Sequence, residues 1–232
     1  MEIVVERSHE RGFSDQGWLR SGFSFSFADY HDRDKMGFGM LRVFNDDSIA
    51  PQKGFGMHPH RDMEIVTVLL KGEIAHEDSM GHKSVLHAPS VQKMSAGSGI
   101  YHSEFNASKD EELKLFQIWI HPMFKGLEPS YEQRELEKTE FTNKLLTLVS
   151  PEPNDKEIKI IQNAKISRGY WDKQAIINYK LSVGTGVFLF VVSGIVNLKG
   201  KTLFERDSAQ ITECEAFDIE LTKDSEVVII EV

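Results

Sequence analysis

Residues 58–72 read HPHRDMEIVTVLLKG and combine a pair of histidines with a strand that closes on a glycine. The run over residues 65–70 is apolar and rich in β-branched side chains, which indicates a buried β-strand that ends in a turn at Gly72. His58 and His60 are spaced i, i+2, so on a strand both imidazoles point to the same face. The stretch therefore predicts a β-sheet that carries metal-binding side chains on one face.

A second pair of metal-binding side chains, His102 and Glu104, follows the segment AGSGI of residues 96–100. The two glycines of this segment allow a tight turn and close backbone approach just before the pair. Two strands of this kind lying side by side would bring three imidazoles and one carboxylate to one point. This is a complete set of protein ligands for Fe(II), Mn(II), Ni(II), Co(II) or Cu(II), and it leaves two positions of an octahedral metal open. Because it contains no thiolate, it disfavours a structural zinc or an iron–sulfur site.

Most of the remaining chain also predicts strands. Phe23, Phe25 and Phe27 alternate with serines, which favours a strand with one buried and one polar face. The charged residues 131–138 favour a connector between domains, and the sequence PEPND at residues 151–155 favours a loop. Further strands are predicted over residues 39–44, 64–70, 73–77, 91–95 and 113–120.

The C-terminal part repeats this pattern. Residues 188–194, FLFVVSG, correspond to residues 66–72, VTVLLKG, and each is an apolar strand that closes on a glycine. Such a repeat indicates a duplicated domain, and a half of about 115 residues can bury a core of its own. All nine histidines lie at or before His121, so the second domain is expected to hold no metal.

The composition excludes several classes of function. With 27 Lys plus Arg against 36 Asp plus Glu, the net charge is −9, which argues against direct binding to nucleic acid. No apolar stretch approaches the roughly 20 residues of a membrane span, and residues 1–7, MEIVVER, become charged too soon for a signal peptide. The single cysteine, Cys214, cannot form an internal disulfide and is expected in or near the core of the second domain. We therefore expect a cytoplasmic protein without membrane association.

The strings HPHRDMEIVTVLLKGEIAHEDSMG, VQKMSAGSGIYHSEFN and LFQIWIHP resemble the pirin family, a branch of the cupin superfamily. The segments GFSDQGWLRSGFSFSFADY and MGFGMLRVFNDD are similar to the opening of bacterial pirin-like proteins, so the resemblance covers most of residues 7–134. It implies an all-β chain with two cupin domains, each a jelly-roll-like β-barrel or double-stranded β-helix. The expected boundaries are 1–134 for a metal-binding domain and 135–232 for a domain without a metal site.

In the pirin family the metal ligands are the two histidines of HPH and the histidine and glutamate of HSE. These fall here on His58, His60, His102 and Glu104. The resemblance implies one divalent transition metal, with Fe(II) favoured and Mn, Ni, Co, Cu or Zn as alternatives. His76, in the motif HEDSMGH, is not at a ligand position and is expected to shape a turn or line the rim of a cavity.

The resemblance also implies quercetin 2,3-dioxygenase activity, in which dioxygen opens the ring of a flavonol and yields a depside and carbon monoxide. The small-molecule partners would then be a flavonol and dioxygen, and Glu104 is the residue expected to accept the proton of the flavonol 3-hydroxyl. An alternative from another class stays open: an iron-binding, redox-sensing regulatory protein that acts through a partner protein. Two neighbours of the motifs receive plainer interpretations. Glu64 is expected as an ion pair with Arg61 or a surface residue, rather than as an acid that approaches the metal, and Trp119 is expected as core or pocket wall, rather than as a specific aromatic clamp.

Overall fold

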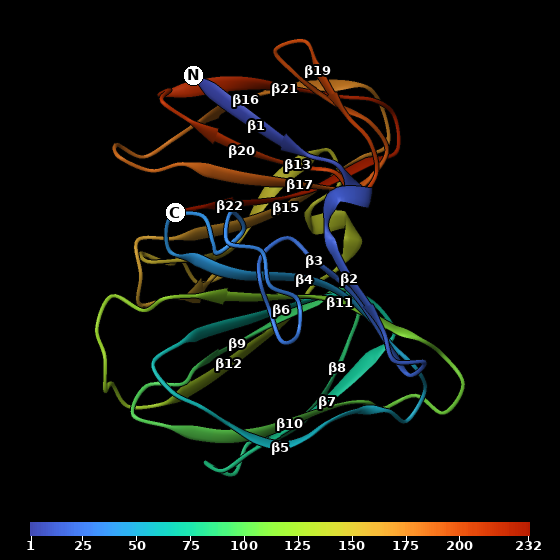
Figure 1. Ribbon diagram of the computed structural model, residues 1–232, viewed down its shortest axis with the longest axis vertical. Coiled ribbons are helices and arrows are strands. Elements are labelled where there is room, and N and C mark those ends of the chain that lie inside the picture. Colours follow the sequence, from blue (N-terminus) through green and yellow to red (C-terminus); the bar gives the residue numbers. More distant parts are fainter. The chain divides into compact units, whose positions relative to one another are not determined.

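The computed structural model describes all 232 residues and consists almost entirely of β-strands (Figure 1). Its two helices are single 3₁₀ turns, η1 (Ser8–Glu10) and η2 (Lys138–Glu140). None of the helices has the length and apolar character that crossing a membrane requires. The prediction of an all-β chain is confirmed.

The chain forms two compact units, which we describe separately. The histidine unit comprises Gly12–Glu137 and Ile160–Gln162. The C-terminal unit comprises Met1–Arg11, Lys138–Lys159 and Asn163–Val232. These units are defined by contacts in the folded chain, and the boundary expected between residues 134 and 135 stays a prediction about the duplicated segments of the sequence.

The histidine unit consists of two antiparallel sheets. Figure 1 shows β5 and β10 side by side, across the unit from β6, β9 and β12. The seven-stranded sheet has the order β12 (Ser130–Glu135), β9 (Ser90–Ser95), β6 (Glu64–Lys71), β11 (Leu113–Ile120), β4 (Leu41–Ile49), β3 (Leu19–Phe23) and β2 (Gly12–Asp15). The four-stranded sheet has the order β5 (Gly54–His60), β10 (Ile100–Asn106), β7 (Glu73–Asp78) and β8 (Lys83–His87).

Most strand predictions in this unit are confirmed. The predicted ranges 64–70, 73–77, 91–95 and 113–120 coincide with β6, β7, β9 and β11 to within one residue at each end. These predictions rest on the pattern of apolar side chains. Such side chains alternate in a strand with one buried face and form a continuous run in a strand with two buried faces. The range predicted over residues 39–44 starts two residues too early and overlaps only the first part of the longer strand β4.

Two predictions are wrong. Strand β3 ends at Phe23, and Ser24 and Ser26 are 2% and 3% exposed, so they form no polar outer face. The chain leaves the sheet there, and the Ser26 hydroxyl donates to the carbonyl oxygen of Asp32 within the loop. Residues 131–138 are no connector over their first part, because β12 pairs with β9. Its charged residues are compatible with its position at the edge of the sheet.

The C-terminal unit repeats this arrangement and confirms the internal repeat. Strand β17 takes the place of β6, and Gly194 after β17 has a φ of 79°, against 80° for Gly72 after β6. Its larger sheet has the order β1 (Glu2–Glu6), β20 (Ser208–Thr212), β17 (Val187–Ser193), β22 (Ser225–Glu231), β15 (Lys165–Trp171), β13 (Lys144–Ser150) and β14 (Ile158–Lys159). Its smaller sheet has the order β16 (Ala175–Lys180), β21 (Ala216–Leu221), β18 (Val196–Leu198) and β19 (Lys201–Leu203).

The interior of the C-terminal unit is apolar at the places that β5 and β10 occupy in the histidine unit. Strands β16 and β21 hold those places in the smaller sheet. Tyr179 of β16, and Phe217 and Ile219 of β21, belong to the unit's hydrophobic core, and the partly buried Ile177 of β16 packs against it. Cys214 packs against the same core, as expected from the sequence.

Candidate metal centre

Three histidine rings meet on the inner face of the four-stranded sheet. His102 of β10 lies opposite His58 of β5, and Ile100 lies opposite His60, so these side chains share a face. The ring centroids are 4.5 Å apart for His58 and His102, 4.8 Å for His58 and His60, and 4.9 Å for His60 and His102. One ring nitrogen of each histidine lies within 4.8 Å of those of the other two. The group can therefore converge on a single ion.

The tautomer of His58 is set by its own strand. Its Nδ1 lies 2.7 Å from the carbonyl oxygen of Gly56, which can only accept a hydrogen bond. Nδ1 therefore carries a proton and donates, which leaves Nε2 as the nitrogen that can face a metal. A backbone carbonyl that fixes the imidazole in this way is a common support for a metal-binding histidine.

His102 is the most deeply buried of the three, with 2% of its surface exposed. Neither of its ring nitrogens has a hydrogen-bond partner. Leaving a buried polar atom without a partner costs about 1–3 kcal/mol, so such atoms point to a bound ion or ligand. The histidine group thus fits a transition metal on the evidence of its own donor atoms.

Two of the histidines, His60 and His102, are also held in the form that binds metals. Burial lowers the pKa of His102 to about 3, and the neighbouring His58 and His76 add to the effect. Burial likewise lowers the pKa of His60 to about 3, with further lowering by His102 and His58. Both imidazoles are therefore neutral at neutral pH, and no proton has to leave them when a metal binds.

Glu104 follows His102 on β10 after an irregularity in the pairing of β10 with β5. Glu104 lies opposite His76 in the pairing of β10 with β7. The ligand atoms of His76, His102 and Glu104 lie within 4.8 Å of one another. His102 thus belongs to two groups, one with His58 and His60 and one with His76 and Glu104. The joint ligand set of three histidines and Glu104 stays a prediction.

The Glu104 carboxylate is 3% exposed and is held from the opposite sheet. Gln92 of β9 donates from Nε2 to Oε1 at 2.6 Å, and Gln117 of β11 donates from Nε2 to Oε2 at 2.9 Å. The hydroxyl of Thr67 on β6 lies 3.3 Å from Oε1. Burial raises the pKa of Glu104, and the neighbouring His76 and the Gln117 amide offset this only in part. The site therefore contains a carboxylate that accepts a proton more readily than one in water does.

The sequence led us to expect His76 in a turn or at the rim of a cavity. It shapes no turn, because alternation along β7 points it into the unit, where it is 1% exposed. It is one of the residues that line a hollow at β7 and β8. Its Nε2 is 3.5 Å from Asp78 Oδ2, and its buried Nδ1 has no partner. Asp78 shapes the turn instead, accepting bonds from the backbone of Met80 and from both the backbone and Nδ1 of His82. Burial works against ionisation of Asp78, but the His82 and Met80 bonds outweigh it and lower its pKa.

Glu64 and Trp119 received plainer interpretations, of which only the second is confirmed. Glu64 is 2% exposed, accepts a hydrogen bond of 2.9 Å from Ser95 and lies 3.6 Å from the ammonium of Lys93, so a surface position or a pair with Arg61 is wrong. Alternation along β6 turns it away from the face that carries Thr67. Trp119 is a wall of the site, with its ring 4.9 Å from that of His60 and nearly perpendicular to it.

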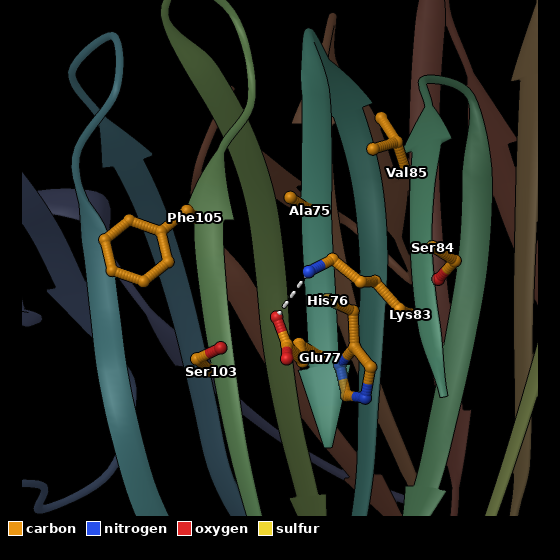
Figure 2. Close-up of a pocket in the computed structure, with 8 residues that line it drawn as sticks. All are labelled: Ala75, His76, Glu77, Lys83, Ser84, Val85, Ser103 and Phe105. Carbon is orange, nitrogen blue, oxygen red and sulfur yellow. Dashed lines mark ion pairs between the residues drawn. The ribbon is translucent and has the colours of Figure 1, made fainter. Parts of the chain in front are cut away.

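A separate hollow of about 280 Å³ lies on the outer face of the four-stranded sheet. Figure 2 shows its lining, in which Lys83 pairs with Glu77 and Phe105 projects from β10. Phe105 alternates with Glu104 along β10, so the hollow and the histidine group lie on opposite faces of the sheet. None of the four predicted ligands lines it.

The residues around Glu104 were not predicted from the sequence. Gln92 lies in the predicted strand VQKMS and Gln117 interrupts the apolar strand LFQIWI. An amide inside a predicted strand is the signal that could have identified them. Tyr131 reaches the same network, since its hydroxyl lies 3.0 Å from Gln92 Oε1. It was missed because its segment was assigned to a connector.

Two β-sandwich units in one chain, of which one gathers histidines on the inner face of its smaller sheet, define a protein of the two-cupin class. The family described as Pirin matches residues 4–120, and the family described as Quercetinase C-terminal cupin domain matches residues 147–232. The chain belongs to the pirin family. The prediction of two cupin domains is confirmed by these matches.

Relatives of known name match over nearly the whole chain. The quercetin 2,3-dioxygenase of Escherichia coli strain K12 is 42% identical over 231 residues, which cover 98% of this chain and 97% of that protein. The pirin-like protein of Caulobacter vibrioides is 38% identical over 221 residues, or 95% of each. The crystal structure of the bacterial pirin YhhW of Escherichia coli, in complex with nickel(II), is 39% identical with a TM-score of 0.94, covering 100% of this chain and 99% of that one.

Proposed function

We propose that this protein is a metal-dependent dioxygenase of the pirin type that opens the ring of a flavonol such as quercetin. The observation that carries the proposal is the convergence of three imidazoles beside a buried carboxylate. Relatives named quercetin 2,3-dioxygenase, matched along nearly their whole length, support the same chemistry. In the reaction, dioxygen adds to the flavonol, two carbon–carbon bonds of the central ring break, and a depside and carbon monoxide leave.

His58, His60, His102 and Glu104 would hold one divalent transition metal. The two unpartnered nitrogens of His102 support this assignment, and so does the nickel(II) of the related YhhW structure. We propose Fe(II) as the native ion, with Mn, Ni, Co, Cu and Zn as the alternatives to test. A metal bound there would supply a Lewis acid that lowers the pKa of the flavonol 3-hydroxyl and brings flavonol and dioxygen to one place.

Glu104 is the proposed proton acceptor for that hydroxyl. Burial has already raised its pKa, which makes it a better base than an exposed carboxylate. Its two amide donors, Gln92 and Gln117, hold the carboxylate on the side of the opposite sheet. The proton therefore moves to an atom whose position is fixed before the substrate arrives.

The apolar wall next to the histidines would hold the planar substrate and limit the access of water. Ile65, Met94 and Ile100 form a buried cluster, against which Trp119 packs. The Trp119 ring also contacts His60. Planar aromatic substrates bind well in sites lined mainly by apolar and aromatic side chains.

The test is metal analysis combined with gas analysis. Protein stripped with a chelator is reloaded with Fe, Mn, Ni, Co, Cu or Zn in separate samples, and oxygen consumption and carbon monoxide release are measured on quercetin. We expect at least one metal to restore turnover, with one carbon monoxide released per dioxygen consumed. Absence of turnover with all six metals would reject the enzyme and leave the iron-dependent regulatory protein as the alternative.

A further inference from the structure

The Glu104 carboxylate lies between two glutamine amides whose orientation is determined by chemistry. Gln92 and Gln117 present Nε2 to its two oxygens at 2.6 and 2.9 Å. A carboxylate only accepts hydrogen bonds, so each amide must turn its NH₂ group toward Glu104 and its carbonyl oxygen away. The direction of the carboxylate therefore depends on whatever holds those two carbonyl oxygens.

A hydroxyl holds each amide oxygen. The Thr67 hydroxyl lies 3.1 Å from Gln117 Oε1, and the Tyr131 hydroxyl lies 3.0 Å from Gln92 Oε1. An amide oxygen can only accept, so both hydroxyls donate to it. If the Gln92 amide turned over, its oxygen would face the carboxylate oxygen and repel it.

The single proton of the Tyr131 hydroxyl has one buried acceptor. The same oxygen lies 3.0 Å from Gln133 Oε1 and 3.2 Å from Ser84 Oγ. Gln133 is exposed and can exchange this contact for water, whereas Gln92 is 3% exposed and cannot. Burial raises the pKa of Tyr131 to about 12, so the phenol keeps its proton at neutral pH.

The Tyr131 side chain is itself fixed at both ends. Its ring stacks on the ring of His76 at a centroid distance of 4.2 Å and an angle of 22°. Its backbone lies opposite Met94 in the pairing of β12 with β9, the strand that carries Gln92. The hydroxyl therefore has little freedom to follow Gln92 if that amide moves.

We propose that Tyr131 is a positioning residue for Glu104: its hydroxyl fixes the Gln92 amide, and that amide fixes the direction of the carboxylate. The kinetic part of this inference rests on the proposed dioxygenase, and the geometric part does not. Without the phenol oxygen, the Gln92 carbonyl oxygen loses its donor, and the amide is held only through its NH₂ group, by Glu104 at 2.6 Å and by Thr67 at 3.3 Å. The shortest hydrogen bond of Glu104 is then less firmly directed. A small misplacement of a reacting group costs up to about a hundredfold in rate.

The test compares Tyr131→Phe with the control Gln133→Ala. The first keeps the ring against His76 and removes only the hydroxyl, and the second removes the exposed neighbour of that same hydroxyl. Both proteins are loaded with Co(II), whose visible absorption reports the arrangement of its ligands. We expect the Co(II) bands to shift in Tyr131→Phe and to match those of the unmodified protein in Gln133→Ala.

Two further measurements separate positioning from general damage. On quercetin, Tyr131→Phe should lower kcat about tenfold or more while KM changes less than about twofold. Gln92→Leu should reproduce both effects, and the double variant should be no worse than either single one, because Tyr131 acts through Gln92. If Gln92→Leu fails to fold, the Co(II) spectrum and the kinetics of Tyr131→Phe test the inference without it.

Unshifted Co(II) bands in Tyr131→Phe, or effects that add in the double variant, would overturn the inference. If the unmodified protein does not turn over quercetin with any metal, the proposed function fails, and the Co(II) spectra still decide the role of Tyr131.

Discussion

His58 and His102 lie directly opposite each other on β5 and β10, with their ring centroids 4.5 Å apart. The register of two strands therefore assembles the histidine group, with no contribution from loop conformation. A slip of one residue in this pairing would turn the histidines of one strand to the outer face of the sheet. Metal binding should consequently respond to changes in strand pairing as well as to loss of the ligands.

Removal of a candidate ligand should remove the metal. We expect His58→Ala and His102→Ala to reduce metal content at least tenfold, because a lost ligand leaves an incomplete set of donors. Elemental analysis of the purified variants measures this. His87→Ala is the control, since its exposed imidazole pairs with Glu73 away from the centre. Unchanged metal content in both ligand variants would show that the site is assigned wrongly.

Two glycines of β5 provide a matched test of the strand pairing. A side-chain carbon at Gly54 would overlap with the Glu104 carbonyl oxygen and with Phe105, whereas one at Gly56 meets nothing within 4 Å. We expect Gly54→Ala to destabilise the protein by about 1–3 kcal/mol and to lower metal content, because β5 must move away from β10. Gly56→Ala should stay within about 0.5 kcal/mol of the unmodified protein. Denaturant unfolding measures the stability of each variant, and elemental analysis measures its metal content. Equal stability and equal metal content in the two variants would contradict the role given to the pairing of β5 with β10.

Glu104→Gln replaces the proposed base by a group of nearly the same size. The new amide presents an NH₂ group where Gln92 and Gln117 already point their own, so it also disturbs the network. We expect quercetin turnover to fall by about a hundredfold or more, with a smaller loss of metal. Turnover per bound metal is the quantity to measure. Full turnover at full metal loading would exclude Glu104 as the base. If turnover and metal content fell by the same factor, Glu104 would be a metal ligand only.

The protein should bind one transition metal per chain. The places of β5 and β10 in the C-terminal unit are taken by β16 and β21, whose inward residues, such as Ile177 and Phe217, are apolar. Apolar side chains offer no donor to a metal. Anomalous scattering from crystals of the metal-loaded protein would locate the ion. A second fully occupied peak within residues 138–232 would refute this prediction.

Glu231 should make the stability of the C-terminal unit depend on pH. It accepts hydrogen bonds from the Tyr179 hydroxyl at 2.6 Å and the Ser182 amide at 2.7 Å. Burial alone would raise its pKa, but these bonds outweigh burial and lower the pKa below its usual 4.5. A lowered pKa in the folded state gives a stabilisation that is complete above about pH 4.5 and is lost as the pH falls through the folded value.

The variant Glu231→Gln tests this dependence. The difference in unfolding free energy between the unmodified protein and the variant should be largest near pH 7 and should shrink as the pH falls below 4.5. Denaturant unfolding at a series of pH values measures it. A difference that stays constant down to pH 3 would contradict the role given to this carboxylate.

The sequence pattern within single strands predicted most of the strands and the two pairs of candidate ligands. It failed to predict contacts that depend on how two sheets pack against each other. The spacing of His58 with His60 and of His102 with Glu104 is a property of single strands, so it is visible in the sequence. The contact of Tyr131 with Gln92 joins strands 39 residues apart, and no periodicity indicates it. Ser24 was misread for a related reason, because burial in a loop leaves no repeating signal.

The pairing of β1 with β20 ties residues 2–6 to residues 208–212. A ribosome adds about 5–20 residues each second, so the first strand waits on the order of ten seconds or more for its partner. The histidine unit is almost continuous in sequence, and its strands are all available well before the last residues are made. Its folding can therefore begin during translation, whereas the sheet of the C-terminal unit closes only when the chain is nearly complete.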